Sequence, residues 1–358
     1  MNVPRNPFGQ ARRRPGWVIA SLTGLATVAV VLLLAVLWGA YTYGGPGPEA
    51  ERGRETTVVL RRGAGLSEIA DTLQRAGVIR SSGLFMTAAQ VTGSAGQLKA
   101  GEYEFPSRSS MADVLARIKS GKIVRHFVTL PEGRTSEDAV QILMNSTVLE
   151  GAAPVPEEGL LLPETYDVQR GDDRAAVLQR MIDARETLLR DLWAARAPDL
   201  PVRTPQEAVI LASIVEKETG IASERPRVAA VFVNRMRQGM RLESDPTVVY
   251  GLTGGRPLGR GLRRSELSAP TPYNTYQIPA LPPGPITNPG RAALVAVLNP
   301  PATDELFFVA DGTGGHVFAK TYEEHLRNVE KWRSVERKRA TGAQPAAAPA
   351  PARATTAG

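Results

Sequence analysis

The stretch TPQEAVILASIVEKETG, residues 204–220, contains the start and stop signals of one α-helix. Thr204 is a favoured N-cap residue, Pro205 suits the first helical position, and Glu207 places an acidic side chain at the third. Gly220 favours termination, because glycine accepts the left-handed backbone that ends many helices. We therefore expect a helix over about residues 205–219, apolar along most of its length.

Glu218 falls on the most apolar face of this expected helix. At about 100° per residue, Glu218 projects only about 20° from Leu211 in the apolar stripe, whereas Glu216 projects about 140° from it. Desolvation and the negative end of the helix dipole both raise the pKa of a carboxyl group placed there. A raised pKa suits a general acid near neutral pH. The alternative is a core glutamate paired with an arginine such as Arg227 or Arg235.

The sequence around this helix predicts the larger of two α+β parts, residues 131–335. A long amphipathic helix is expected around residues 178–192, and another helix at about residues 224–238. Loops rich in glycine and proline follow. The stretches LFFVA and HVFAK flank the turn DGTGG, and they predict a β-hairpin over residues 306–320.

Residues 56–130 predict a smaller α+β module. The stretches TTVVL and GEYEF are strand-like, and an apolar stripe between them predicts a short helix that stops at Gly77. Ser110 and Asp113 form a possible capping box at the start of a second helix, which closes at Gly121.

Residues 17–43 contain no charged residue and predict a single transmembrane helix. As a helix, the stretch from Trp17 to Trp38 alone is about 33 Å long, enough for the hydrocarbon core of a bilayer. Four arginines and no acid lie in residues 1–16, so the positive-inside rule places that segment in the cytoplasm and the rest of the chain outside. The alternative, a cleaved signal peptide, has a shorter apolar run. Residues 44–55 are expected to form a linker.

The net charge of +7 is concentrated at the two ends of the chain. Residues 1–16 contribute +4 and residues 331–358 contribute +5, so −2 remains for the part between them. Nucleic acid is therefore not an expected partner, because binding to phosphates needs a basic surface. The Ala/Pro-rich tail, residues 340–358, is expected to be disordered and dispensable.

No metal or cofactor is expected. The chain contains no cysteine, and His126, His316 and His325 lack the spacing of a zinc site. No glycine-rich loop has the pattern of a dinucleotide or nucleotide site.

The expected helix also carries a family resemblance. Its segment LASIVEKETG, residues 211–220, resembles the signature helix of the endolytic murein transglycosylase family (MltG, YceG-like). Further segments resemble the family in the same order: EEGLLLPETY, VFVNRMRQGMRLESDPTVVYG, PYNTYQIPALPPGPITNPG and FFVADGTGGHVF. The resemblance implies an enzyme of the bacterial inner membrane with a periplasmic or extracytoplasmic catalytic domain, and a LysM-like fold for residues 56–130.

The resemblance implies that Glu218, the second glutamate of the E-K-E-T motif, is the catalytic residue. The helical pattern places the same glutamate on the apolar face. The implied reaction is lytic cleavage between N-acetylmuramic acid and N-acetylglucosamine within peptidoglycan glycan strands, which leaves 1,6-anhydro-muramoyl ends and consumes no water. The resemblance also implies that the enzyme ends the elongation of nascent strands and has penicillin-binding peptidoglycan synthases as partners.

Other polar residues of the matched segments are candidate saccharide contacts. Each has a structural alternative: Asp245 before Pro246 can be a turn residue, and Asn274 can tie a loop. The candidates are Glu164, Asp245, Thr247, Asn274 and Tyr276.

Two other functions stay open. A hydrolytic muramidase would use Glu218 with a second carboxylate such as Asp245 and release a reducing end. A membrane-anchored peptidoglycan-binding scaffold would use the anchor and the small module without catalysis. The mass of the products distinguishes the first alternative, and replacement of Glu218 distinguishes the second.

Overall fold

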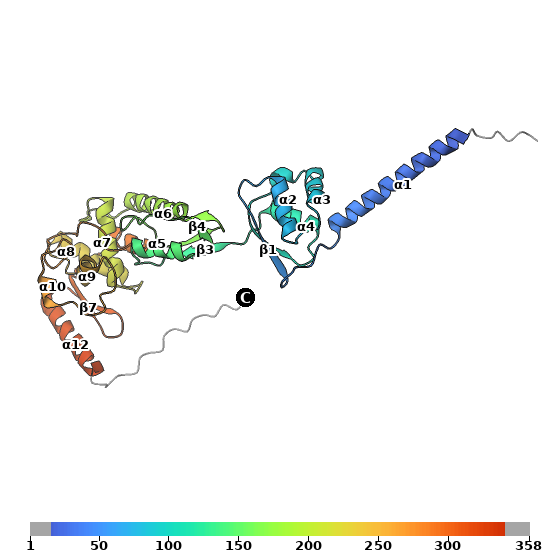
Figure 1. The fold of residues 1–358 in the computed structure, drawn as a ribbon. Helices are drawn as coiled ribbons and strands as arrows, with labels where there is room; N and C mark the ends of the chain where they lie inside the picture. Colours follow the sequence, from blue (N-terminus) through green and yellow to red (C-terminus); the bar gives the residue numbers. More distant parts are fainter. Residues whose placement is uncertain (1–15, 341–358) are drawn as a thin grey trace, which may run out of the picture. The chain divides into compact units, whose positions relative to one another are not determined.

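The computed structural model describes residues 16–340, which divide into two units between Arg125 and His126 (Figure 1). The predicted cytoplasmic segment before Gly16 and the predicted tail after Ala340 lie outside the described residues. Each unit has its own apolar core. The described part of the chain contains both helices and strands, as the sequence predicts.

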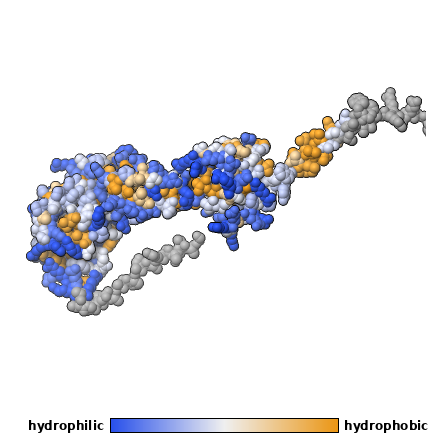
Figure 2. Space-filling view, viewed as in Figure 1, coloured by the Kyte–Doolittle hydropathy of each residue, from blue (hydrophilic) through white to orange (hydrophobic). Residues whose placement is uncertain are grey.

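The first unit begins with α1 (Gly16–Gly44), a continuous apolar helix. Its segment Gly24–Gly44 has a mean hydropathy of 2.2, and none of it is buried in the protein. Figure 2 shows this segment as a hydrophobic surface. By length and composition α1 can cross a membrane, which agrees with the predicted anchor.

A small α+β module follows α1. β1 (Glu55–Leu60) and β2 (Gly101–Pro106) pair antiparallel, with Val58 opposite Tyr103. Leu73 and Phe85 from the helices pack with Tyr103 in one core. The helices of the module are α2 (Leu66–Arg75), α3 (Ser82–Val91), the short 3-10 helix η1 (Ala95–Gln97) and α4 (Met111–Ser120).

The predicted start and stop of α4 are confirmed. The Ser110 hydroxyl accepts a hydrogen bond from the Asp113 backbone N–H at 3.1 Å and donates one to the Asp113 carboxylate at 2.6 Å. Gly121 ends the helix with a φ of 71°, in the left-handed region that glycine adopts easily. Helix α3 is an addition to the sequence prediction.

The boundary between the units differs from the predicted one after residue 130. β3 (His126–Thr129) pairs antiparallel with β5 (Thr165–Val168), so its backbone hydrogen bonds tie it to the second unit. Val128 accordingly packs in a core cluster with residues of that unit. A strand of four residues shows too little alternation for its partner to be deduced from sequence.

The second unit surrounds one central helix, α7 (Pro205–Glu218). Its elements are β3, α5 (Ser136–Asn145), β4 (Leu149–Glu150), β5, β6 (Asp172–Asp173), α6 (Arg174–Ala194), α7, α8 (Arg225–Arg237), α9 (Asp245–Thr253), α10 (Arg264–Ser268), α11 (Arg291–Leu298), β7 (Phe307–Ala310), β8 (His316–Ala319) and α12 (Tyr322–Ala340). The predicted hairpin is present as β7 and β8, which pair antiparallel. Helices α6, α8, α9 and α11 all contact α7.

The predicted N-terminal signals of α7 are present in the structure. The Thr204 hydroxyl accepts a hydrogen bond from the Glu207 backbone N–H at 3.1 Å, and the Glu207 carboxylate accepts one from the Arg203 backbone N–H at 2.6 Å. Together these contacts satisfy two donors at the helix start. They fix the register of α7 and therefore the direction in which Glu218 projects.

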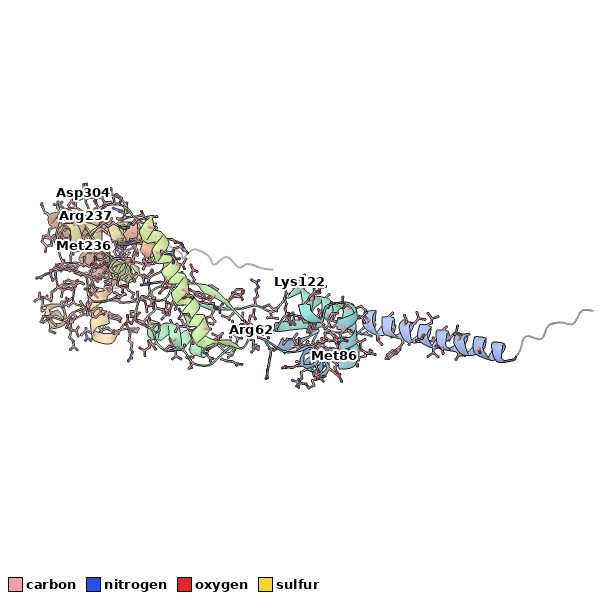
Figure 3. All side chains as sticks on the ribbon, turned by 90° about the horizontal axis from the view of Figure 1, so that it is seen from above. Arg62, Met86, Lys122, Met236, Arg237 and Asp304 are labelled. Carbon is pink, nitrogen blue, oxygen red and sulfur yellow. The ribbon has the colours of Figure 1, made fainter. Side chains whose placement is uncertain are left out.

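Helix α8 ends beside the segment that leads into β7. The Asn234 side-chain amide donates to the Thr303 carbonyl at 2.8 Å and to the Glu305 carbonyl at 3.1 Å. Figure 3 shows Arg237, at the end of α8, and Asp304 in this region. These contacts fix the hairpin β7–β8 against the helices around α7.

Candidate active site

Glu218 is the last residue of α7, and its side chain is half-buried. The Ser244 hydroxyl donates a hydrogen bond to Glu218 Oε1. Ser244 itself is 1 % exposed. A carboxyl group that is largely removed from water and contacts one neutral donor can exchange a proton without losing an ion-pair partner.

The pKa of Glu218 is raised to about 7, mainly by burial and also by the negative charge of Asp245, against the lowering effects of the Ser244 hydrogen bond, His316 and Arg235. Desolvation disfavours the ionised form, and this effect is the largest of the set. A carboxyl group with a pKa near 7 is protonated often enough to act as an acid and ionised often enough to act as a base.

Ser244 occupies the N-cap position of α9, but it does not cap that helix with its side chain. Serine at this position usually accepts a backbone N–H from the first turn. Here the hydroxyl is directed to Glu218 instead. The residue before it, Glu243, has a φ of 54°, a left-handed conformation that is unfavourable for a non-glycine residue. Helix α9 therefore lacks a side-chain cap, and the backbone at Glu243 is strained. Strained backbone is common at functional sites.

Two buried threonines hold Ser244 in place. The Ser244 backbone N–H donates to Thr275 Oγ1 at 2.9 Å, and the Thr247 hydroxyl donates to the Ser244 carbonyl at 2.7 Å. The two threonine hydroxyls lie 2.8 Å apart and share a hydrogen bond. Thr247 and Thr275 are both fully buried, so they hold the Ser244 backbone from the interior of the protein.

Asp245 and Tyr276 form a hydrogen-bonded pair close to Glu218. The Tyr276 hydroxyl donates to Asp245 Oδ1 at 2.7 Å. Burial and the neighbouring carboxylates of Asp245 and Glu218 raise the pKa of Tyr276, so this hydroxyl stays protonated. The structure therefore brings these two predicted site residues together beside the predicted catalytic residue.

Asn274 connects this region to α10. It is fully buried, and its side-chain amide donates to the carbonyls of Leu267 and Ala269 at 3.0 and 2.7 Å. Its side-chain oxygen accepts the Tyr276 backbone N–H at 3.0 Å. These contacts correspond to the structural alternative given for Asn274, the tying of a loop, and they position Tyr276.

Glu164 lies apart from this cluster. Its carboxylate is 3.7 Å from the Arg291 guanidinium, and both side chains are exposed. It lines a surface hollow of about 400 Å³ with Leu162, Asp183 and Arg291, and none of the residues hydrogen-bonded around Ser244 lines that hollow. The structure gives Glu164 no contact with Glu218 or its neighbours.

The arginine alternative for Glu218 does not correspond to the structure. Arg227 pairs with Glu305, and Arg235 pairs with Glu243 at 3.0 Å while donating to the Leu242 carbonyl at 3.0 Å. Arg235 acts on Glu218 only through its charge. Glu218 is therefore not the charge-neutralised core glutamate of the alternative.

Glu216, which the helical pattern predicts to lie away from the core, is buried. Its side chain is 4 % exposed, lies 3.2 Å from the Arg225 guanidinium and accepts the Gly290 backbone N–H at 2.9 Å. Burial raises the pKa of Glu216, against the opposing effects of Gly290 and Arg225. The prediction was wrong because neighbouring helices cover α7 on several sides, so that residues 208–216 are all buried.

Sequence reasoning missed Ser244 and the pair formed by Glu224 and His316. His316 Nδ1 is 2.8 Å from a Glu224 carboxylate oxygen, and the other oxygen accepts the His316 backbone N–H at 3.0 Å. The position of Ser244 directly before Asp245 in a matched segment was the available signal. Glu224 and His316 are far apart in sequence, and no spacing rule connects them. Within residues 16–340, no three His, Asp or Glu side chains form a group that could hold a metal ion.

Comparison with known proteins identifies the family of the chain. The model of the YceG-like family matches residues 58–331, which include nearly all of both α+β parts and every residue described above around Glu218. The chain belongs to the YceG-like family. The recognition made from the sequence segments is thereby confirmed.

Curated relatives of this family member carry one name. An endolytic murein transglycosylase of Bacillus subtilis (strain 168) is 28 % identical over 337 residues, which cover 83 % of this chain and 91 % of the relative. An endolytic murein transglycosylase of Streptococcus pneumoniae (serotype 2, strain D39) is 27 % identical over 331 residues, 78 % of this chain, and the match spans 59 % of the pneumococcal protein. A solved structure of a putative yceG-like protein from Listeria monocytogenes is 26 % identical, with a TM-score of 0.48, and covers 76 % of this chain and 98 % of its own.

Proposed function

We propose that this chain is a membrane-anchored endolytic lytic transglycosylase that cleaves peptidoglycan between N-acetylmuramic acid and N-acetylglucosamine. The observation that carries the proposal is the Ser244–Glu218 contact: one half-buried carboxyl group with a pKa of about 7, at the end of the helix that resembles the family signature. The names of the curated relatives support murein as the substrate.

One carboxyl group is enough for this reaction. Protonated Glu218 donates its proton to the glycosidic oxygen, and the bond between that oxygen and C1 of the muramoyl sugar breaks. The muramoyl C6 hydroxyl then bonds to C1 and transfers its proton to the Glu218 carboxylate, which restores the acid. The proton, the electron pair and all atoms are accounted for without water. A pKa near 7 allows the same group to serve in both steps.

The neighbours of Glu218 divide into two proposed roles. Asp245 and Tyr276 present polar groups beside the acid, and we assign saccharide contact to them. Thr247 and Asn274 are fully buried, and their side chains donate hydrogen bonds to the backbone carbonyls of Ser244 and Ala269. We therefore assign positioning roles to both. Glu164 would contact only a more distant part of a glycan strand, given its separate hollow.

The small module and the anchor fit the same proposal. The module between β1 and α4 is a candidate LysM-like unit, which would hold glycan near the membrane. Helix α1 would keep the enzyme where nascent strands are made, so that cleavage ends their elongation. Penicillin-binding peptidoglycan synthases are the partners that this placement suggests.

The rate profile with pH gives one test of the site. Because the first step needs protonated Glu218, kcat/KM on peptidoglycan is expected to fall as pH rises through about 7. Ser244→Ala removes a hydrogen bond that favours the ionised carboxylate, so the pKa of Glu218 rises and the falling limb moves to higher pH. Ser268→Ala, which removes an exposed hydroxyl on α10, serves as the control and leaves the limb in place. A limb that stays fixed or moves to lower pH in Ser244→Ala would contradict the assigned contact.

The proposed topology gives a second test. The four arginines in residues 1–16 predict a cytoplasmic N-terminus, with the small module and the second unit outside. Alkaline phosphatase fused after Arg339 is therefore expected to be active, since it folds only after export. A fused cytoplasmic reporter at the same position should be inactive, and activity of that reporter alone would show the opposite orientation.

A further inference from the structure

A second hollow adjoins α7 on the side of Glu216. It has a volume of about 700 Å³, within the range of about 300–1,000 Å³ usual for ligand sites. Lys217 and Gly220, which lie on either side of Glu218 in sequence, both line it. The hollow therefore adjoins the C-terminal end of α7, and Glu218 itself does not line it.

The lining of this hollow is charged. Among its described lining residues are eight charged side chains, four of each sign, and no aromatic ring. Ligand sites are usually lined mainly by apolar and aromatic side chains. A wall that carries charged side chains of both signs and no aromatic ring suits a ligand that carries both carboxylates and an amine.

A buried guanidinium forms the floor of the hollow. The Arg225 side chain is 8 % exposed and contacts Glu216 at 3.2 Å and Glu132 at 3.4 Å through one nitrogen, Nη2. Its Nε is buried and has no hydrogen-bond partner within the described part of the chain. A buried donor without a partner is costly to the fold, and it marks this wall of the hollow as unusual.

Exposed ion pairs form the rim. Arg256 lies 3.4 Å from Glu137, and Arg134 lies 3.7 Å from Asp138, with all four side chains about half exposed or more. Such pairs contribute little to stability, so a ligand carboxylate can replace one partner at little cost. The planar guanidinium binds a carboxylate with two parallel hydrogen bonds.

From this lining we propose that the hollow binds the stem peptide of peptidoglycan. This inference rests on the proposed function. The sugars of a glycan strand are neutral, and the charges of the substrate lie on the peptide, which carries carboxylates and a free amine. The peptide is attached to the muramoyl sugar, the same sugar whose C1 reacts at Glu218. Arg134 and Arg256 bind the carboxylates, and the acidic residues of the rim receive the amine.

Binding of the free stem tetrapeptide tests the proposal directly. The full chain in detergent, carrying Glu218→Gln so that no cleavage occurs, is titrated calorimetrically with the tetrapeptide. Arg134→Ser with Arg256→Ser is expected to weaken binding at least tenfold. The matched control is Arg196→Ser with Arg203→Ser, two exposed arginines of a separate hollow of about 500 Å³, and it should bind as the parent does. No binding by the parent, or equal binding by the rim variant, would overturn the proposal.

A cleavage assay separates this proposal from the proposed reaction. With an intact Glu218, the ratio of cleavage rates on peptide-bearing strands to rates on strands stripped by an amidase is expected to fall at least tenfold in the rim variant. An unchanged ratio would contradict the peptide subsite even if both rates fall. Absence of cleavage on every strand, with tetrapeptide binding retained, would count against the lytic reaction and leave the subsite supported.

Discussion

Replacing Glu218 by glutamine is expected to lower the turnover of peptidoglycan at least about 10²-fold, the typical contribution of a general acid/base. Glutamine keeps the shape of the side chain and an oxygen that can accept the Ser244 hydroxyl, but it cannot donate or take the proton. The measurement is the rate of release of soluble muropeptides from purified peptidoglycan by equal amounts of folded protein. A scaffold without catalysis would give no activity to lose.

The stability of Glu218→Gln provides an independent readout. The raised pKa means that ionisation of Glu218 opposes folding, so stability is fully present at low pH and declines as pH rises through about 7. Glutamine removes this effect, and the variant is expected to be as stable as the parent at pH 5 and equally or more stable at pH 8. Glu216→Gln, which keeps an acceptor for Gly290 and Arg225, is the matched control and should retain most of its turnover. Normal turnover in Glu218→Gln with loss in Glu216→Gln would refute the assignment.

Glu216→Ala is expected to cost about 3–5 kcal/mol of unfolding free energy, the usual effect of removing one partner of a buried ion pair. The substitution leaves the Arg225 charge with only the more exposed Glu132, and it leaves the Gly290 backbone N–H at the start of α11 without its acceptor. Urea denaturation followed by tryptophan fluorescence measures the change, because Trp193 packs against the core around α7.

Glu137→Ala is the matched control for this prediction. Glu137 also pairs with an arginine, Arg256, but both side chains are exposed. Its loss is expected to change the unfolding free energy by less than about 1 kcal/mol. If Glu216→Ala is no more destabilising than Glu137→Ala, the buried pair does not stabilise the second unit as described.

The local elements of the fold could be predicted from sequence because their signals are local. The caps of α4 and α7 involve residues three apart, and the hairpin of β7 and β8 surrounds a single turn. Strand β3 could not be assigned, since its partner β5 lies far along the chain. The burial of Glu216 could not be predicted either. Helical periodicity identifies the most apolar face of a helix, but it does not show how many neighbours will cover the other faces.

Part of the candidate site could also be proposed from the sequence. Glu218 follows from its position on the helix and from the resemblance, and Asp245 and Tyr276 lie beside it as a hydrogen-bonded pair. Ser244 was missed although it precedes Asp245 in a matched segment, because a serine before a helix normally predicts a cap. Its backbone is held by Thr247 in the first turn of α9 and by Thr275 from a distant segment, and the second contact cannot be deduced from a local sequence pattern.

The chemistry of cleavage is the central claim, and the mass of the products tests it most directly. The full chain in detergent is incubated with purified peptidoglycan, and the released ends are analysed by mass spectrometry. Lytic cleavage predicts 1,6-anhydro-muramoyl ends, lighter by one water than the ends that hydrolysis gives. Asp245, close to Glu218, is the carboxylate that a hydrolase would use for water. Reducing muramoyl ends as the main product would show that the enzyme is a muramidase and would contradict the proposed reaction.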